Sequence, residues 1–416
     1  MSKTNNNKKR VLYVENGIGY GGAIICLRYL VRHLDRERFE PMVVTGRTGT
    51  QYQEISNEAA WLHISDRHID VINMQRKLAT LHWPDTIIGM RFLLRQLLAR
   101  LDDVANFIPF FMHLLWSTWR FKPHLIHVNN EPLCNRAALL VGKILGIPII
   151  CHVRGEQKGS WLMRWLYGIP HHFIAVSEWI SSSIGQVNVP PSKRTVIYDG
   201  IELQKLDLHA DGTVFRKKYN IPEDAFVVGL VGLLIPWKGQ RLFLEATRQL
   251  MRDIPNIAIL IVGGTPDECY SFEQELRTLA NESDFNGKVI FTGHVVDMPT
   301  VYNGLDIVVS ASTSPEPLGT MIIECLTMAR PLVAPQHGGA VEMVDHEHTG
   351  LLFLPNDATD LAVKIKRFYD SVELRETLGT AAREKALATF AVEEHARHVQ
   401  KIYDEFLTEY QQGYPT

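Results

Sequence analysis

The stretch VVSASTSPEPLGTMIIECLTMARPLVAPQHGGAVEMVDHEHTGLL, residues 308–352, decides the predicted fold. It starts within a short apolar strand over 307–309, passes through a polar loop, and enters a helix near Gly319. A second strand over 331–334 leads into a Gly-Gly turn at 338–339. Strand, helix and strand at this spacing predict a βαβ unit of a parallel sheet.

Two carboxylates lie at the carboxyl end of this unit, where open parallel sheets bind their ligands. Glu316 is in the loop after the strand, and Glu324 is about one turn inside the helix. Backbone amides at the start of a helix lack intrahelical partners and carry partial positive charge, which suits a diphosphate. Here these amides belong to Leu318, Gly319 and Thr320.

A carboxylate accepts hydrogen bonds from paired hydroxyls. The interpretation is therefore a sugar-nucleotide site, with Glu324 on the ribose and Glu316 on a hexose. The alternative for Glu316, which stands between two prolines, is a solvated turn residue.

The segment VGLLIPWKGQ, residues 231–240, predicts a second contact to phosphate. A strand ends at Gly232, and Lys238 precedes a helix. A lysine at that place offsets diphosphate charge as a point cation. The alternative is an exposed lysine in the first turn of the helix.

The N-terminal half opens with a predicted strand over 10–15, a glycine-rich turn over 16–22 and a helix over 23–34. The glycine spacing resembles a dinucleotide fingerprint, which is weak by itself. Gly46-Arg47 follows the second strand in place of an acid for a ribose, which argues against NAD. We expect the amides of Gly21 and Gly22 to approach a phosphate or an acceptor across a cleft; the alternative is a plain βα turn.

Further strands are predicted where apolar runs end at turn residues. In the first half they cover 123–129, 147–153, 173–176 and 195–198, and in the second half 226–232, 257–262, 288–292 and 306–310. His127 lies within an apolar strand end and is interpreted as structural. His152 ends a strand at its carboxyl edge and is a candidate for the site.

Composition narrows the class of protein. A chain of 416 residues with 46% apolar residues predicts two domains. A net charge of −3 gives no basic field for nucleic acid. Five scattered cysteines without a CxxC pair indicate free thiols in a reducing compartment. The polar start runs directly into a strand, so no signal peptide is expected and the predicted location is cytoplasmic.

Residues 83–120 are rich in Leu, Ile, Phe and Trp, with interspersed arginines. Pro109 is expected to break them into two helices. One interpretation is an in-plane helix at the inner face of a membrane. The other is a pair of helices that pack on the sheet of the first domain.

The spacing Glu316-x7-Glu324 resembles the signature of the family 4 retaining glycosyltransferases, which have the GT-B fold. Other segments resemble the family in the same order: Gly21-Gly22, VSEWI (176–180), VIYDGIEL (196–203), VGLLIPWKGQ (231–240), FTGHVVDMP (291–299) and TGLLFLPND (349–357). The resemblance is dense over 170–360 and thin over 45–125.

This resemblance implies an α/β protein with two Rossmann-like, doubly wound domains that face each other across a cleft. Residues 1–200 would bind the acceptor, 201–390 would bind the nucleotide sugar, and a helix over 391–416 would cross back to the first domain. The implied reaction moves a hexose, with retention, to a saccharide or lipid-linked acceptor in the synthesis of cell-surface polysaccharide or glycolipid.

The resemblance also assigns roles to residues. Glu316, His152 and Lys238 form the catalytic set, and Val295 and Gly232 join the donor-binding residues. No Asp-x-Asp pair is present, so we expect neither a catalytic metal nor a cofactor. Relatives usually carry Arg in place of Leu233. Either Arg241 partly replaces that cation, or the helix start near Gly319 carries more of the charge.

Two alternative functions remain open at this stage. One is a sugar-nucleotide epimerase or phosphorylase of the same fold. The other is a non-catalytic nucleotide-sugar-binding subunit, for which Leu233 is the supporting residue.

Overall fold

The computed structural model describes residues 8–17, 21–66, 90–158, 161–285 and 287–411. The chain forms two compact units. Unit 1 contains residues 1–176, 180–197 and 396–416, and unit 2 contains residues 177–179 and 198–395. Each unit is a parallel sheet with helices, so the predicted α/β class with two doubly wound sheets is confirmed.

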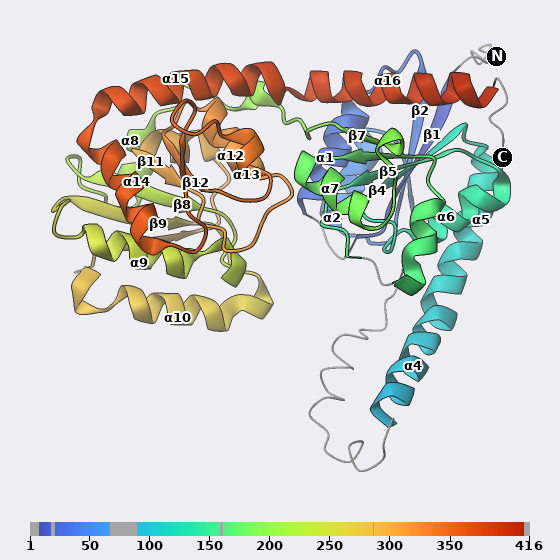
Figure 1. Ribbon diagram of the computed structural model, residues 1–416, viewed down its shortest axis with the longest axis horizontal. Helices are drawn as coiled ribbons and strands as arrows, with labels where there is room; N and C mark the ends of the chain where they lie inside the picture. Colours follow the sequence, from blue (N-terminus) through green and yellow to red (C-terminus); the bar gives the residue numbers. More distant parts are fainter. Residues whose placement is uncertain (1–7, 18–20, 67–89, 159–160, 286, 412–416) are drawn as a thin grey trace. The chain divides into compact units, whose positions relative to one another are not determined.

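The sheet of unit 1 has the order β3-β2-β1-β4-β5-β6-β7 (Figure 1). Its strands are β1 (Lys9–Glu15), β2 (Phe39–Thr45), β3 (Ala60–His63), β4 (Leu125–Asn129), β5 (Ile149–Val153), β6 (His172–Ala175) and β7 (Arg194–Val196). The strand order reverses between β1 and β4, which makes that point of the edge a ligand site in open parallel sheets. The sequence did not predict β3, because the residues around it are polar and show no regular apolar spacing.

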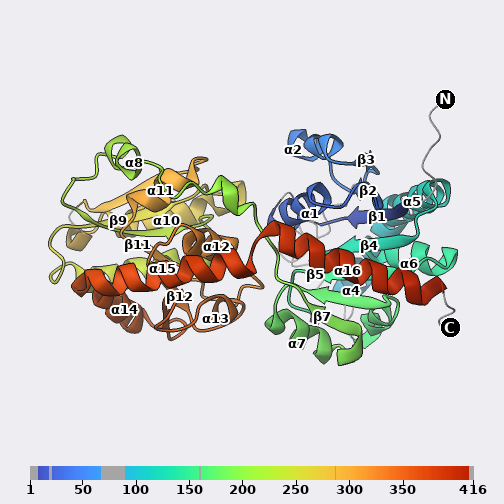
Figure 2. The same cartoon turned by 90° about the horizontal axis from the view of Figure 1, so that it is seen from above.

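The named helices of unit 1 surround this sheet, except that α4 projects away from it (Figure 1). They are α1 (Gly22–Arg32), α2 (Thr50–Gln53), α4 (Met90–Asp102), α5 (Ile108–Phe121), α6 (Arg136–Leu145), α7 (Glu178–Gln186) and α16 (Val392–Gln411), of which α7 and α16 have their first residues in unit 2. α1 and α16 share one apolar core with β1, β2 and β4, and α5 packs against α6. Figure 2 shows α16 lying along the strands.

Tyr403 anchors α16 to the sheet. Its side chain is fully buried, and its hydroxyl bonds to His127 Nδ1 at 2.7 Å and donates to the Tyr13 hydroxyl at 3.1 Å. Both partners come from central strands, so the end of the chain completes the core of unit 1. His127 is therefore structural, as predicted.

Removing the Tyr403 hydroxyl is expected to destabilise unit 1. Tyr403→Phe should lower the free energy of unfolding by about 1–3 kcal/mol, because two buried hydrogen bonds are lost. The midpoint of thermal unfolding measures this. Lys401→Ala is the matched control, since its side chain is 70% exposed on the same helix. Equal midpoints for the two variants would contradict the anchoring role.

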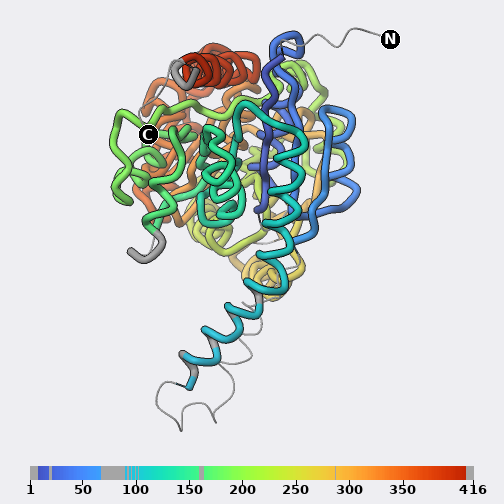
Figure 3. The backbone as a smooth tube through the Cα atoms, turned by 90° about the vertical axis from the view of Figure 1, so that its right-hand side faces the viewer, coloured from blue at the N-terminus to red at the C-terminus, as the bar shows by residue number. Residues whose placement is uncertain are grey.

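The apolar segment that the sequence marked out is a continuous helical run. Residues 83–89 lie outside the described part; from Met90 the chain forms α4, a π-helical turn over Asp103–Phe107, and α5. Two helices are present, as expected, but Pro109 does not interrupt the helical run. It occupies the first turn of α5, a position that tolerates the missing N–H of proline. Figure 3 shows this run continuing past the rest of unit 1.

The sheet of unit 2 has the order β10-β9-β8-β11-β12-β13. Its strands are β8 (Phe226–Val231), β9 (Ile257–Val262), β10 (Val289–Gly293), β11 (Ile307–Val309), β12 (Leu332–Pro335) and β13 (Leu351–Phe353). Strand order reverses between β8 and β11. The βαβ unit predicted from residues 308–352 is thus confirmed as β11, α12 and β12.

The main helices of unit 2 are α8 (Gly212–Lys218), α9 (Gln240–Leu250), α10 (Tyr270–Ala280), α11 (Met298–Gly304), α12 (Thr320–Thr327), α13 (Ala340–Met343), α14 (Ala358–Asp370) and α15 (Val372–Thr389). Alternate strand residues, such as Val228 and Leu230, share a core with α9, α10 and α14. α12 packs against α15. The loops at the carboxyl ends of the strands are thereby held on a rigid frame.

Candidate active site

Lys238 and Glu316 meet at the point where the strand order of unit 2 reverses. Lys238 follows β8 and Glu316 follows β11, two strands that are neighbours in the sheet. The Lys238 Nζ lies 2.6 Å from Glu316 Oε2 in an ion pair whose side chains are 21% and 16% exposed. The two residues are 78 positions apart in the sequence, so the fold brings them together.

Backbone contacts fix the two loops that carry this pair. The N–H of Thr313 donates to the carbonyl of Trp237 at 2.8 Å. Gly239 has a φ of 76°, and a Cβ built there would lie 1.8 Å from the Ala311 carbonyl oxygen. Glycine is therefore required at 239, because any side chain would separate the two loops.

The Gly-Gly turn of the sequence supports Glu316 from behind. The N–H of Gly339 donates to the Glu316 carbonyl at 2.8 Å. Gly338 has a φ of 60°, and a Cβ there would lie 2.7 Å from the same oxygen. The Ser312 hydroxyl also bonds to Glu316 Oε1. The carboxylate is thus held by partners from several directions.

Glu316 and Gly319 line a pocket together with residues that sequence reasoning did not identify. Its other polar lining residues are Ser310, Ser312 and His337. Burial lowers the pKa of His337, although the Glu316 carboxylate opposes this shift. The imidazole is therefore neutral at pH 7 and offers one donor and one acceptor to a ligand. The position of His337 directly before the Gly-Gly turn was the only sequence signal for it.

The start of α12 forms another side of the site. α12 begins at Thr320, its N-cap Gly319 has an extended φ of −94°, and no side chain caps it. Leu318 is half-buried just before it. The amides at this helix start carry partial positive charge, as predicted from the sequence.

Glu324 lies within α12 and bonds to a residue on another helix. The Tyr302 hydroxyl, on α11, donates to Glu324 Oε2 at 2.7 Å. Burial raises the pKa of Glu324, and the bond from Tyr302 opposes this shift. Tyr302 is fully buried and was not identified from the sequence.

Two family models match this chain, one in each half, and both describe glycosyltransferases. The model of the family "Glycosyl transferases group 1" matches residues 211–385, and that of "Glycosyltransferase Family 4" matches residues 20–205. The chain belongs to the group 1 glycosyltransferases. It is therefore a transferase, and the two units have the GT-B fold that the sequence predicted.

Two named relatives support this family. The chain is 29% identical over 310 residues to "Putative glycosyltransferase YtcC" of Bacillus subtilis (strain 168), a match that covers 70% of this chain and 75% of the relative. It is 25% identical over 242 residues to the capsular polysaccharide biosynthesis glycosyltransferase CapM of Staphylococcus aureus, covering 57% of this chain and 62% of the relative.

A solved structure shows the same fold. The Anabaena protein Alr3699/HepE, crystallised in complex with UDP, superposes with a TM-score of 0.78 at 20% identity. The match covers 95% of this chain and 100% of that one.

Two more residues that the resemblance assigned to the donor lie at strand ends, and their contact with a donor stays a prediction. Gly232 follows β8 with a φ of 153°, and the half-buried Val295 follows β10. Leu233 is 52% exposed. The substitute cation Arg241 forms an ion pair with Glu275. The two side chains of that pair are 56% and 50% exposed, and a role of Arg241 at the phosphates stays a prediction.

The candidates in unit 1 differ in exposure. Gly21 is the N-cap of α1 and Gly22 its first residue; both are exposed, and a Cβ at either would meet nothing within 4 Å. Packing within the unit therefore does not require glycine there. His152 is fully buried beside His127 and Arg154. Its contact with a sugar stays a prediction.

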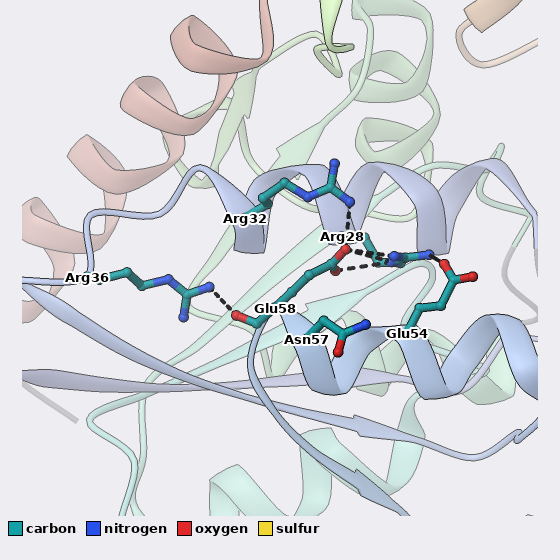
Figure 4. Close-up of a pocket in the computed structure, with 6 residues that line it drawn as sticks. All are labelled: Arg28, Arg32, Arg36, Glu54, Asn57 and Glu58. Carbon is teal, nitrogen blue, oxygen red and sulfur yellow. Dashed lines mark hydrogen bonds and ion pairs between the residues drawn. The ribbon is translucent and has the colours of Figure 1, made fainter. Parts of the chain in front are cut away.

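The side chains that line a large surface pocket beside α1 form ion pairs with one another (Figure 4). Arg28 bonds to both oxygens of Glu58 and to Glu54, and Arg32 bonds to Glu58 at 2.6 Å. Arg36 bonds to the Glu58 carbonyl. We interpret this network as a clamp between α1 and the turn before β3. It lies in unit 1, whereas the Lys238–Glu316 pair lies in unit 2.

Among the described residues, no three His, Cys, Asp or Glu side chains gather as a metal site. The mixed run at 345–348 instead forms ion pairs, from Asp345 to Lys385 and from Glu347 to Arg367. The described cysteines are free thiols. None of the described helices combines the length and apolarity needed to cross a membrane.

Proposed function

We propose that this glycosyltransferase moves a hexose from a nucleoside diphosphate to a hydroxyl of a saccharide or lipid-linked saccharide, with retained anomeric configuration and without a metal. Retention rests on the resemblance to family 4. Support for the donor class comes from the Anabaena neighbour, which was crystallised with UDP and with UDP-glucose. Support for a role in cell-surface polysaccharide comes from the name of the CapM relative.

The ion pair between Lys238 and Glu316 is the observation that carries the proposal. It places a cation and a carboxylate 2.6 Å apart at the strand-order reversal, in loops held rigid by Gly239 and Gly338. The uncapped start of α12 follows Glu316 by four residues. A ligand with an anion and a hydroxylated ring side by side fits this set of groups, and a hexose diphosphate has both.

In the proposed reaction, the acceptor oxygen bonds to the anomeric carbon while the bond from that carbon to the diphosphate oxygen breaks. The acceptor proton passes to the departing diphosphate. Lys238 and the amides of Gly319 and Thr320 stabilise the charge that grows on the diphosphate. Glu316 orients the hexose hydroxyls, and Glu324 accepts bonds from the ribose.

A donor screen tests the proposal. Thermal shift with UDP-, GDP- and ADP-hexoses should raise the melting temperature for one nucleotide class, because a specific ligand stabilises the folded state by mass action. That donor should then yield a glycoside with the donor's anomeric configuration, read by NMR. Stabilisation by none of the donors, or an inverted product, would contradict the proposal.

The role given to Glu324 predicts a pH dependence. Its raised pKa means that the carboxylate gains a proton at higher pH than an ordinary glutamate, so affinity for the nucleoside diphosphate should fall as pH falls through that value. Tyr302→Phe removes a bond that lowers the pKa, so its affinity should start to fall at a higher pH. Calorimetric titrations over a pH series measure both proteins, and the titration of the nucleotide itself cancels in the comparison. Identical curves would refute the ribose role.

We also propose that the enzyme lies at the inner, cytoplasmic face of a membrane through α4 and α5. An apolar stripe follows one face of the helical run at intervals of three or four residues, and its members are all exposed: Leu93, Leu97, Leu101, Val104, Ile108, Met112, Trp116 and Trp119. The opposite side of α5 packs inward through Phe110 and Leu114. The side chain of Arg100 is 72% exposed, and the Arg120 guanidinium lies 5.6 Å from the Trp116 ring centroid. Apolar residues with flanking arginines suit an anionic bilayer surface.

Co-sedimentation with anionic vesicles tests this contact. Trp116→Ala combined with Trp119→Ala should weaken pelleting by about tenfold or more, because burial of roughly 100 Å² of apolar surface is worth about 2.5 kcal/mol. Tyr270→Ala, an exposed aromatic on α10, is the matched control and should pellet as the wild type does. Absence of lipid-dependent pelleting in the wild type would remove the membrane proposal.

A further inference from the structure

Two hollows in unit 1 share a common wall. One lies at the carboxyl edge of the sheet and is lined by Asn16, Asp66 and Cys134. The other is a groove between the α4–α5 run and α6, lined by Ile108, Leu140 and Trp165. Phe107 and Arg136 line both hollows. The two hollows are therefore neighbours, and these two side chains form the boundary between them.

The first hollow has a polar floor suited to hydroxyl groups. Asn16 follows β1 and Asp66 follows β3, and the two residues are 9% and 6% exposed. The Asn16 amide Nδ2 donates to Asp66 Oδ2 at 2.7 Å, and its backbone N–H donates to Asn135 Oδ1 at 3.2 Å. The same Nδ2 also donates to the Cys134 carbonyl at 3.3 Å, so both amide hydrogens are used. The Asn16 amide oxygen and the Asp66 carboxylate are the acceptors that this hollow offers to hydroxyl groups. This hollow also lies beside β1, where the strand order of unit 1 reverses.

The shared wall is cationic. The Arg136 guanidinium lies 4.3 Å from the Phe107 ring centroid and donates to Asp103 Oδ1 at 2.8 Å. A guanidinium has five N–H donors, and this bond uses one of them. A planar cation held by a ring and a carboxylate suits a phosphate oxygen.

The groove on the other side is apolar and joins the exposed stripe. Ile108 belongs to both the groove and the stripe, and it is 48% exposed. Trp165, 53% exposed, closes the groove from a 3-10 helix over Trp161–Gly168. The order along unit 1 is thus a polar hollow, a cation and an open, largely apolar groove at the proposed membrane face.

We infer that the acceptor is an amphiphile whose hydroxylated head binds at Asn16 and Asp66, whose phosphate passes Arg136, and whose hydrocarbon chain lies in the groove. This inference rests on the proposed function for its meaning, since it names the class of acceptor. The hydroxyl of the head is the group that receives the hexose. The structure thereby assigns chemical roles to Phe107, Arg136 and Trp165, which the sequence did not indicate.

The test uses decyl phosphate and methyl phosphate as probes of the full-length protein, below the micelle concentration, by calorimetry. Decyl phosphate should bind at least about tenfold more tightly than methyl phosphate, because its chain buries apolar surface. Ile108→Glu should remove this advantage, and Arg136→Met should weaken both probes. Leu97→Glu is the matched control, because Leu97 is an exposed stripe residue that does not line the groove.

The outcomes distinguish binding in the groove from binding on the open helix surface. Equal affinity for the two probes, or an equal loss in Leu97→Glu and Ile108→Glu, would overturn the groove, since the chain would then lie on the open helix surface. A circular-dichroism melt of Ile108→Glu like that of the wild type ensures that lost binding is not lost folding. Donor stabilisation without decyl phosphate binding would overturn this inference and leave the proposed function. Decyl phosphate binding without stabilisation by any donor would contradict the proposed function and leave the amphiphile site standing.

Discussion

Glu316→Ala is expected to lower the rate of hexosyl transfer by about a thousandfold (~4 kcal/mol), because an oriented group at the reacting centre is lost. The affinity for the nucleoside diphosphate should stay within about threefold, since Glu316 is assigned to the hexose. If affinity changes, it should rise, because Lys238 loses its carboxylate partner. Steady-state transfer rates and nucleotide titrations measure the two effects separately.

Glu245→Ala, an exposed glutamate on α9, is the matched control and should transfer at the wild-type rate. Glu324→Ala provides the contrast, since it should weaken nucleotide binding before it slows transfer. Similar small losses in Glu316→Ala and Glu324→Ala would show that the two carboxylates do not have the assigned roles.

Lys238→Ala is expected to weaken both nucleotide binding and transfer. Loss of a charged hydrogen bond to the diphosphate costs about 1.5–3 kcal/mol, or roughly ten- to a hundredfold in affinity. The rate of transfer should fall further, by about a hundredfold or more, because charge on the diphosphate grows as the bond breaks. Nucleotide titrations and single-turnover rates distinguish these losses.

The exposed Lys217→Ala on α8 is the matched control for the loss of one positive charge. The double variant Lys238→Ala with Glu316→Ala should be less impaired than the two single effects combined, because the side chains are in direct contact. Full additivity, or wild-type nucleotide affinity in Lys238→Ala, would argue against a shared site.

The ion pair also indicates how the site responds to its ligand. Lys238 and Glu316 neutralise each other across 2.6 Å. In the proposed reaction, a diphosphate would compete with Glu316 for the ammonium group of Lys238, and the released carboxylate would then turn to the hexose hydroxyls. Under this proposal, donor binding would free Lys238 for the diphosphate and Glu316 for the hexose in one step.

The fold was predictable where apolar runs carry a clear period. The strands of unit 2 up to β12 lie close to their predicted bounds, because each is a short apolar run between turn residues. β13, α14 and α15 were not predicted, although the Asp357 side chain caps the start of α14. The helical run through 103–107 was also missed, since a π-turn leaves no signal that distinguishes it from a break at Pro109.

The sequence indicated which residues belong to the candidate site, but not which of them contact one another. Strand ends and glycines located Lys238 and Glu316 in separate loops, yet only the strand order brings β8 beside β11. Tyr302 was missed because it contributes through Glu324, a residue of another helix. His337 was missed because its place in the pocket depends on the fold rather than on a sequence pattern. The Gly-Gly turn was recognised from the sequence. Only the structure shows why glycine is needed there, because Gly338 lies close to the Glu316 backbone.

A crystal structure of the protein with the nucleoside diphosphate that stabilises it most is the most direct test of the central claim. The account predicts diphosphate oxygens within hydrogen-bond distance of Lys238 Nζ and of the Thr320 amide, with the ribose hydroxyls on Glu324. A diphosphate bound away from the start of α12, with the Lys238–Glu316 pair unchanged, would contradict it.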